Sequence, residues 1–222
     1  MTRRDENPPR AGWAFAALLA LALAAGWLVY APGLRGAFLL DDFPNLETLG
    51  YIAPPLTADG LVSFVFSDVS GVSGRLLALA SFALQYRAWP GDPAAFKTVN
   101  LLIHLGNALL LCAVFLHAGR LAGLPARRAR ATALFAAALW LLHPLHVSTV
   151  LYVVQRMTEI AAFFTLAGLL AYLHGRERLA SSARRGYAWM LAGIALGGAL
   201  AVLGKETGVL LPLYALVMEK TL

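Results

Sequence analysis

The sequence is poor in charge and almost devoid of cysteine. Only 14% of its 222 residues are charged, against about 25% in soluble domains, and 59% are hydrophobic, which excludes an ordinary soluble domain. Cys112 is the one cysteine, so an internal disulfide is excluded and the redox compartment stays undetermined. The net charge of +6 does not indicate nucleic-acid binding, because the basic residues lie mostly in short loops between apolar blocks.

The hydrophobic residues are gathered in long blocks without charge. A helix needs about 20 apolar residues to cross the ~30 Å of hydrocarbon in a bilayer. The blocks are residues 11–30, 99–116, 131–155, 161–172 and 186–204, with a shorter run at 207–218. The sequence therefore predicts an all-α polytopic membrane protein with about five to six spans. The first block is longer than the apolar core of a signal peptide, so we expect a retained anchor.

The basic residues predict an orientation. With the N-terminus in the cytoplasm, twelve Lys and Arg and four acids lie on the cytoplasmic side, against six and eight outside. This is the bias that the positive-inside rule requires. The chain then divides into a cytoplasmic basic tail (1–10) and a membrane domain (11–222), with a long outer loop at residues 31–98. Residues 76–86 of that loop predict an amphipathic helix lying in the membrane interface.

Two features set the expected ends of the later spans. Pro144 interrupts the third block, which predicts a short span followed by an irregular outer segment. The run at 207–218 is shorter than a span, and the sequence stops soon after it, so we expect the membrane domain to be incomplete. An Ala-rich composition that prefers Arg to Lys indicates a bacterial protein, for which the location would be the inner membrane.

The first polar motif is the adjacent pair Asp41 and Asp42, shortly after the first span. If both carboxylates face one site, their repulsion raises one pKa, which suits a general base or a clamp for a hydroxyl nucleophile or a divalent metal. The alternative is a solvated turn beside Pro44 and Asn45, and on these residues alone the turn is favoured.

The second motif combines His143 and His146 with Arg156 and Glu159. Arg156 and Glu159 are three residues apart, so they can pair on one helix face, and ionisable groups at this depth are costly and tend to be functional. Two histidines alone are a weak metal site, because zinc takes three or four ligands, and no cofactor is expected. The alternative is an interfacial anchor with a local ion pair.

Basic groups on two other segments complete the pattern. Lys205 and Glu206 follow Gly204 in a tight hairpin, and Arg75 begins the amphipathic stretch. Each cation suits a phosphate, although a solvated turn and a snorkelling arginine are the plain alternatives. Three polar residues of the second span, spaced on one side of a helix, are expected to hydrogen-bond within the bundle: Asn100, His104 and Asn107.

The predicted topology places all these charged residues on the outer side. A carboxylate pair facing several cations is suited to a substrate that carries phosphate, with one carboxylate activating a nucleophile and the basic groups stabilising the leaving phosphate. The candidate catalytic residues are Asp41 and Asp42. The candidate substrate-binding residues are Arg75, His143, His146, Arg156, Glu159, Lys205 and Glu206.

The ordered motifs FLLDDFPNL, GRLLALASFALQY, FKTVNLLIHLGNALLL, LHPLHVSTVLYVVQRMTEIAAFF and GKETGVLLPL resemble a glycosyltransferase family. They are similar to the N-terminal half of the GT-C transmembrane and tetratricopeptide-repeat O-mannosyltransferases and their bacterial relatives. The resemblance implies a GT-C-like helical bundle that transfers a sugar from a polyprenyl-phosphate carrier to a protein or glycan on the outer face. It implies a catalytic carboxylate at Asp41 or Asp42, and carrier binding by Arg156 and Lys205. The further spans and repeat domain of that family have no counterpart here.

Two other functions remain open from the sequence. One is a non-catalytic membrane subunit, or a fragment, whose outer loop docks a partner. The other is a small transporter, which is disfavoured because transporters place ionisable groups near the bilayer midplane and most charges here lie at the faces. The expected partners are membrane lipid, the lipid-linked sugar donor and the acceptor. The sugar, the acceptor and the oligomeric state are not predicted.

Overall fold

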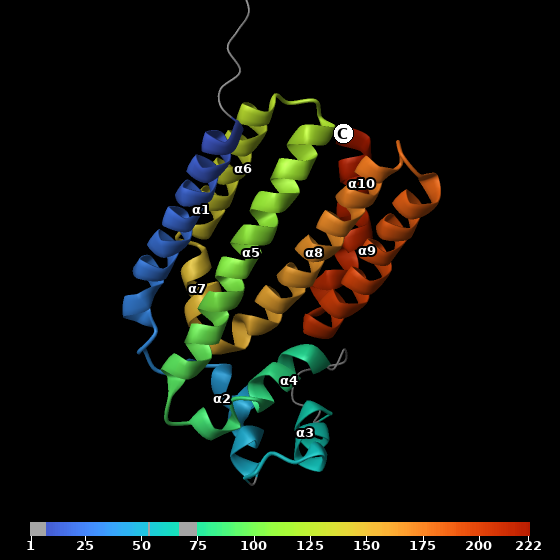
Figure 1. The fold of residues 1–222 in the computed structure, drawn as a ribbon. Helices are drawn as coiled ribbons and strands as arrows, with labels where there is room; N and C mark the ends of the chain where they lie inside the picture. The colour runs from blue at the N-terminus through green and yellow to red at the C-terminus, as the bar shows by residue number, and fades with distance from the viewer. Residues whose placement is uncertain (1–7, 53, 67–74) are drawn as a thin grey trace, which may run out of the picture.

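The computed structural model describes residues 8–52, 54–66 and 75–222, and these contain helices and no strand. The predicted basic tail (1–10) lies mostly outside the described residues. Figure 1 shows α1, α5, α6, α8, α9 and α10 side by side as one bundle, with α2, α3 and α4 at one end and the C-terminus at the other. The prediction of an all-α polytopic membrane protein is confirmed.

The bundle helices follow the apolar blocks. In the part of the chain that the structure describes, four helical segments are long and apolar enough to cross a membrane: Gly12–Gly33, Pro93–Leu121, Val153–Arg178 and Ala183–Gly204. The corresponding helices are α1 (Pro8–Tyr30, followed by the 3-10 helix η1, Ala31–Gly33), α5 (Pro93–Leu121), α8 (Arg156–Arg178) and α9 (Ala183–Gly204). α5 begins where it does because Pro93 suits a first helical position and the Asp92 side chain accepts a hydrogen bond from the Ala95 N–H at 3.2 Å.

The two remaining expected spans are shorter helices. α6 (Ala126–Leu141) has 16 residues and α10 (Leu211–Thr221) has 11, so four helices rather than five or six meet the length of a span in the described residues. The third block breaks at Pro144, as predicted, and continues as α7 (His146–Leu151) and η5 (Val153–Gln155). η6 (Glu206–Leu210) leads from α9 into α10.

The described residues of the predicted outer loop (31–98) form a cap on one end of the bundle up to the start of α5. In its described residues the helices are α2 (Asp42–Leu46), η2 (Glu47–Tyr51), α3 (Ala58–Val65), α4 (Leu76–Ala83) and η4 (Tyr86–Ala88). Apolar side chains of this cap, among them Leu46 and Phe82, are buried against Phe96, Val153 and Met157 of the bundle. The predicted helix over 76–86 forms in its first part, with one face buried. The cap therefore holds the candidate residues against the start of α8.

α8 and α9 approach closely because glycines face each other. A Cβ added to Gly197 would lie 2.7 Å from the Cα of Gly168, and one added to Gly193 would lie 2.6 Å from the Gly168 carbonyl oxygen. Small residues at such contacts let the two backbones touch, which is how helices gain packing energy in a membrane.

Gly197→Ala is expected to lower the free energy of unfolding by about 1–3 kcal/mol, because the obstructing atoms belong to the backbone of α8 and cannot rotate away. Gly198→Ala is the matched control, since the nearest atom to its added Cβ is 3.8 Å away on a Leu211 side chain. Denaturant titration of the detergent-solubilised protein compares the two. Equal stability of both variants would contradict the close-contact interpretation.

Candidate functional site

Asp42 joins the outer cap to the bundle. Its carboxylate is fully buried and accepts hydrogen bonds from the backbone N–H groups of Leu39 and Val154, both at 2.8 Å. Lys97 lies nearby and donates to the carbonyls of Gly36 and Ala37 at 2.8 and 2.9 Å. Burial raises the pKa of Asp42, against the opposing effect of the two N–H donors. The sequence suggested that repulsion between Asp41 and Asp42 raises one pKa, whereas in the structure the cause is burial of Asp42.

Asp41 has the opposite environment, although it is the next residue. Its side chain is exposed, and its backbone N–H donates to the Tyr152 hydroxyl at 2.6 Å. Its carbonyl accepts from the Asn45 side chain at 2.7 Å, so the predicted turn is present as well. Burial, and then the adjacent carboxylate of Asp41, raise the pKa of Tyr152, which keeps the phenol neutral. Asp41 is the carboxylate of the pair that a substrate can reach.

The backbone is strained beside the exposed Asp41 and at the half-buried Arg75. Among the described non-glycine residues only Leu40 and Arg75 have a left-handed φ, at 25° and 37°. Leu40 immediately precedes Asp41, and its side chain is exposed, so packing of that side chain does not explain the conformation. Such strain costs about 1–3 kcal/mol and tends to occur at functional positions. The backbone strain indicates a functional role for Asp41 and Arg75, and this indication does not depend on their charge.

Arg156 is buried and structural in this arrangement. Its guanidinium, with no exposed surface, donates to Asn100 Oδ1 at 2.8 Å, to the Phe96 carbonyl at 2.8 Å and to the Ser81 carbonyl at 3.2 Å. It also lies over the Phe82 ring, 4.5 Å from the centroid. These contacts join α4, α5 and α8. The predicted pair with Glu159 is not formed, and the guanidinium offers no free face to the carrier phosphate expected there.

Lys205 and Arg75 are partly exposed cations, and they contact the residues that follow Arg156 in the chain. The Lys205 ammonium donates to the Thr158 hydroxyl at 2.9 Å and is partly exposed. Arg75 donates to Glu206 at 3.0 Å and contacts the Met157 sulfur at 3.3 Å. The turn expected after Gly204 is present, because α9 ends at Gly204 and the chain continues through Lys205 into η6. Gly204 also lies against α8, where an added Cβ would be 2.9 Å from the Ala161 nitrogen.

One short segment connects these groups. Tyr152 contacts Asp41, Val154 contacts Asp42, and Thr158 contacts Lys205. Tyr152 and Thr158 are six positions apart, which is on the order of 10 Å along helical backbone. The anomeric phosphate of a sugar and the acceptor hydroxyl fit within such a span. Segment 152–158 is therefore the centre of the candidate site.

The remaining predicted residues form a second, internal cluster. Glu159 is 2% exposed, its Oε1 lies 3.9 Å from His104 Nδ1, and neither carboxylate oxygen has a hydrogen-bond partner among the described residues. The His104 ring stacks on Trp140 with centroids 4.6 Å apart. Trp140 contacts His146, which in turn contacts His143 near the surface. Burial, and then His143, lower the pKa of His146. Trp140 of this cluster also lines a groove with Thr158, the residue that Lys205 contacts.

The three polar residues of the second span bond within the bundle, as predicted. Asn100 donates to the carbonyl of Val153 at 3.2 Å, His104 Nε2 lies 3.2 Å from the Leu141 carbonyl, and Asn107 donates to the Glu159 carbonyl at 3.1 Å. Each of these three contacts holds α5 against a neighbouring segment of the bundle.

Sequence reasoning missed Tyr152, Thr158 and Lys97. The first two belong to the motif LYVVQRMTE, where their place beside Arg156 was the available signal. Lys97 was visible as a charge at the start of an apolar block. In the part of the chain that the structure describes, no group of three or more His, Cys, Asp or Glu residues could hold a metal ion.

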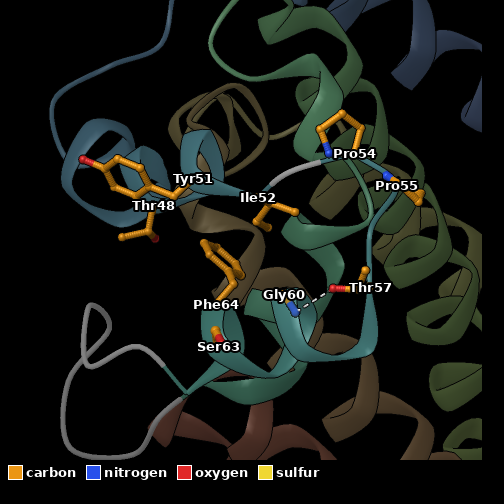
Figure 2. Close-up of a pocket in the computed structure, with 9 residues that line it drawn as sticks. All are labelled: Thr48, Tyr51, Ile52, Pro54, Pro55, Thr57, Gly60, Ser63 and Phe64. Atoms are coloured by element: carbon orange, nitrogen blue, oxygen red, sulfur yellow. Dashed lines mark hydrogen bonds between the residues drawn. The ribbon is translucent and has the colours of Figure 1, made fainter.

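Two hollows lie near this end of the molecule. One is a pocket of about 530 Å³ in the cap. Figure 2 shows its lining, where the Thr57 hydroxyl accepts a hydrogen bond from the Gly60 N–H and Phe64 lies close by. It contains none of the predicted charged residues. A groove of about 270 Å³ runs between α5, α6, α8 and α10 and begins at Thr158 and Thr207. Its walls farther along are largely apolar, as at Leu111 and Leu169.

The chain is similar in sequence to two curated proteins. It is 35% identical over 150 residues to the human Protein O-mannosyl-transferase TMTC4, which covers 64% of this chain. It is 30% identical over 153 residues, again 64% of this chain, to the mouse protein of the same name. The matches span 20% of the length of each relative. No protein-family model and no solved structure matches the chain.

Proposed function

We propose that this chain is the membrane portion of a glycosyltransferase that moves a sugar from a polyprenyl-phosphate carrier to a hydroxyl group of a protein or glycan. The sequence similarity to proteins named O-mannosyl-transferases carries this proposal and makes mannose the first sugar to test. The structure adds an exposed carboxylate, Asp41, and a partly exposed cation, Lys205, on opposite ends of segment 152–158.

Asp41 acts as the general base. It takes the proton of the acceptor hydroxyl as the hydroxyl oxygen attacks the anomeric carbon. The new bond from carbon to the acceptor oxygen forms while the bond from carbon to the phosphate oxygen breaks. The electron pair leaves on the phosphate, and no nucleotide sugar is needed. Asp42 holds the loop in place through Val154 and does not touch the reacting atoms.

Lys205 and Arg75 receive the phosphate. The Lys205 ammonium donates to the Thr158 hydroxyl. The Arg75 guanidinium contacts the Met157 sulfur and donates to the Glu206 carboxylate. A phosphate is a stronger acceptor than a hydroxyl, and charge-assisted bonds of this kind are about twice as strong as neutral ones. The growing negative charge of the leaving phosphate therefore gains stabilisation from both residues in the transition state.

The groove beside Thr158 suits the carrier tail. It begins at the hydroxyl that Lys205 contacts and continues between apolar side chains of α5, α8 and α10. A prenyl chain placed there keeps its phosphate at Lys205. The carrier thus enters with its anionic end at the cap and its apolar end along the bundle.

Lys205→Gln is expected to weaken binding of undecaprenyl-phosphate mannose by about 10-fold or more, because a charge-assisted bond to phosphate is lost. Binding is measured by native mass spectrometry of the purified chain with added carrier. Transfer of mannose to an acceptor peptide is measured separately. Arg87→Gln is the control, since Arg87 is an exposed arginine of the same cap whose Nε donates only locally, to the Tyr86 hydroxyl.

Unchanged carrier binding in Lys205→Gln would remove Lys205 from the phosphate site. A parent chain that binds no carrier would contradict the glycosyltransferase proposal and favour a non-catalytic subunit that docks a partner.

A further inference from the structure

A second apolar groove lies at the opposite end of the bundle, between α1 and α6. Its volume is about 880 Å³. α1 contributes Ala14, Phe15 and Leu18. The α6 residues that line it are Ala126, Arg127, Arg130, Ala131, Leu134, Phe135 and Ala138.

The pattern of α6 explains the groove. Positions 127, 130, 131, 134 and 138 share one helix face, since they recur at intervals of three and four. The neighbouring face of α6 packs through Ala133 and Ala137 against the bundle. Alanines on the first face, and Ala14 across from them, leave space between α1 and α6 where larger side chains would fill it.

Two arginines stand at one end of this groove. Arg127 and Arg130 belong to the first turns of α6, whose N-terminus at Pro125 has no capping side chain. The connection from 122 to 130 contains no acid, and no ion pair involves either arginine within residues 8–52, 54–66 and 75–222. Two guanidinium groups and uncapped N–H groups together favour a bound anion.

The dimensions indicate which anion. From position 127 to position 138 a helix rises about 16 Å. This is close to half of the ~30 Å hydrocarbon core, which is the depth of one leaflet. A free phosphate would leave the apolar part empty, whereas a lipid fills both parts with one molecule.

We propose that the α1–α6 groove binds an anionic glycerophospholipid of the surrounding membrane. The lipid phosphate lies at Arg127 and Arg130, and an acyl chain lies along Ala131, Leu134 and Ala138. Basic pockets between membrane helices are suited to acidic lipid headgroups. The site is at the far end of the bundle from Asp41 and Lys205, and it does not depend on the proposed transfer reaction.

The test is native mass spectrometry of the purified chain titrated with phosphatidylglycerol or with phosphatidylcholine of the same acyl chains. We expect about 10-fold tighter retention of phosphatidylglycerol. Arg127→Gln with Arg130→Gln is expected to reduce that preference to about 2-fold or less. Arg184→Gln with Arg185→Gln is the matched control, because these residues are also a basic pair in the first turn of a helix at this end and do not line the groove.

A second variant tests the acyl-chain part of the groove separately from the headgroup part. Ala131→Leu with Ala138→Leu fills the groove with good helix formers while both arginines remain, and it is expected to lose the retained lipid. Excess glycerol phosphate is expected not to displace the lipid. Equal retention of the two lipids by the parent chain would overturn the proposal, as would displacement by glycerol phosphate or unchanged retention in the filled variant.

Discussion

Asp41→Asn is expected to lower sugar transfer by about 10²–10⁴-fold while carrier binding stays at the parent level. An amide cannot take a proton from the acceptor hydroxyl, but it has nearly the shape of the carboxylate. The Asp41 side chain is exposed, so the change leaves no buried group unpaired. The hydrogen bond from its backbone N–H to Tyr152 is retained as well, so the position of the residue is kept.

The assay uses the form of the protein that shows transfer, and it measures transfer and carrier binding separately. Glu47→Gln is the control, since Glu47 is an exposed acid of the same cap, at the start of η2. Transfer at the parent rate by Asp41→Asn would show that Asp41 only forms the turn with Asn45. The enzymatic proposal would then lack its base.

Arg156→Met is expected to produce the largest loss of stability, about 3 kcal/mol or more in the free energy of unfolding. Methionine fills part of the space but donates no hydrogen bond. Asn100 Oδ1 and the Phe96 carbonyl then remain buried, and the Ser81 carbonyl partly buried, with the donor that Arg156 supplied removed. Each such bond to a charged donor contributes about 1.5–3 kcal/mol, and the contributions are not additive.

Denaturant titration of the detergent-solubilised protein measures this loss, with Arg178→Met as the control at the exposed end of the same helix. Arg156→Lys is expected to restore only part of the stability, because a single ammonium cannot replace a planar fork with several donors. Should Arg156→Met unfold at the same midpoint as the parent while carrier binding falls, the guanidinium would be a ligand for phosphate rather than a structural link.

The membrane architecture follows from the sequence by itself. An uncharged block of about 20 residues that crosses a bilayer folds as a helix, because every backbone N–H and C=O must be hydrogen-bonded within the bilayer. Pro144 predicted the break that separates α6 from α7, and Gly204 predicted the tight turn after α9. Alternation of the spans also placed the charged motifs at one end of the bundle, where segment 152–158 joins Asp41 to Lys205.

The roles of the individual charged residues were decided only by the tertiary structure. Asp41 and Asp42 are chemically identical neighbours, and one is exposed while the other is buried because Val154, 112 positions away, donates to the second. Arg156 and Glu159 had the spacing of an ion pair, yet the guanidinium meets carbonyls of α4 and α5, and the carboxylate faces His104. Sequence spacing describes one helix, whereas burial of a polar group depends on the partners that distant segments bring to it.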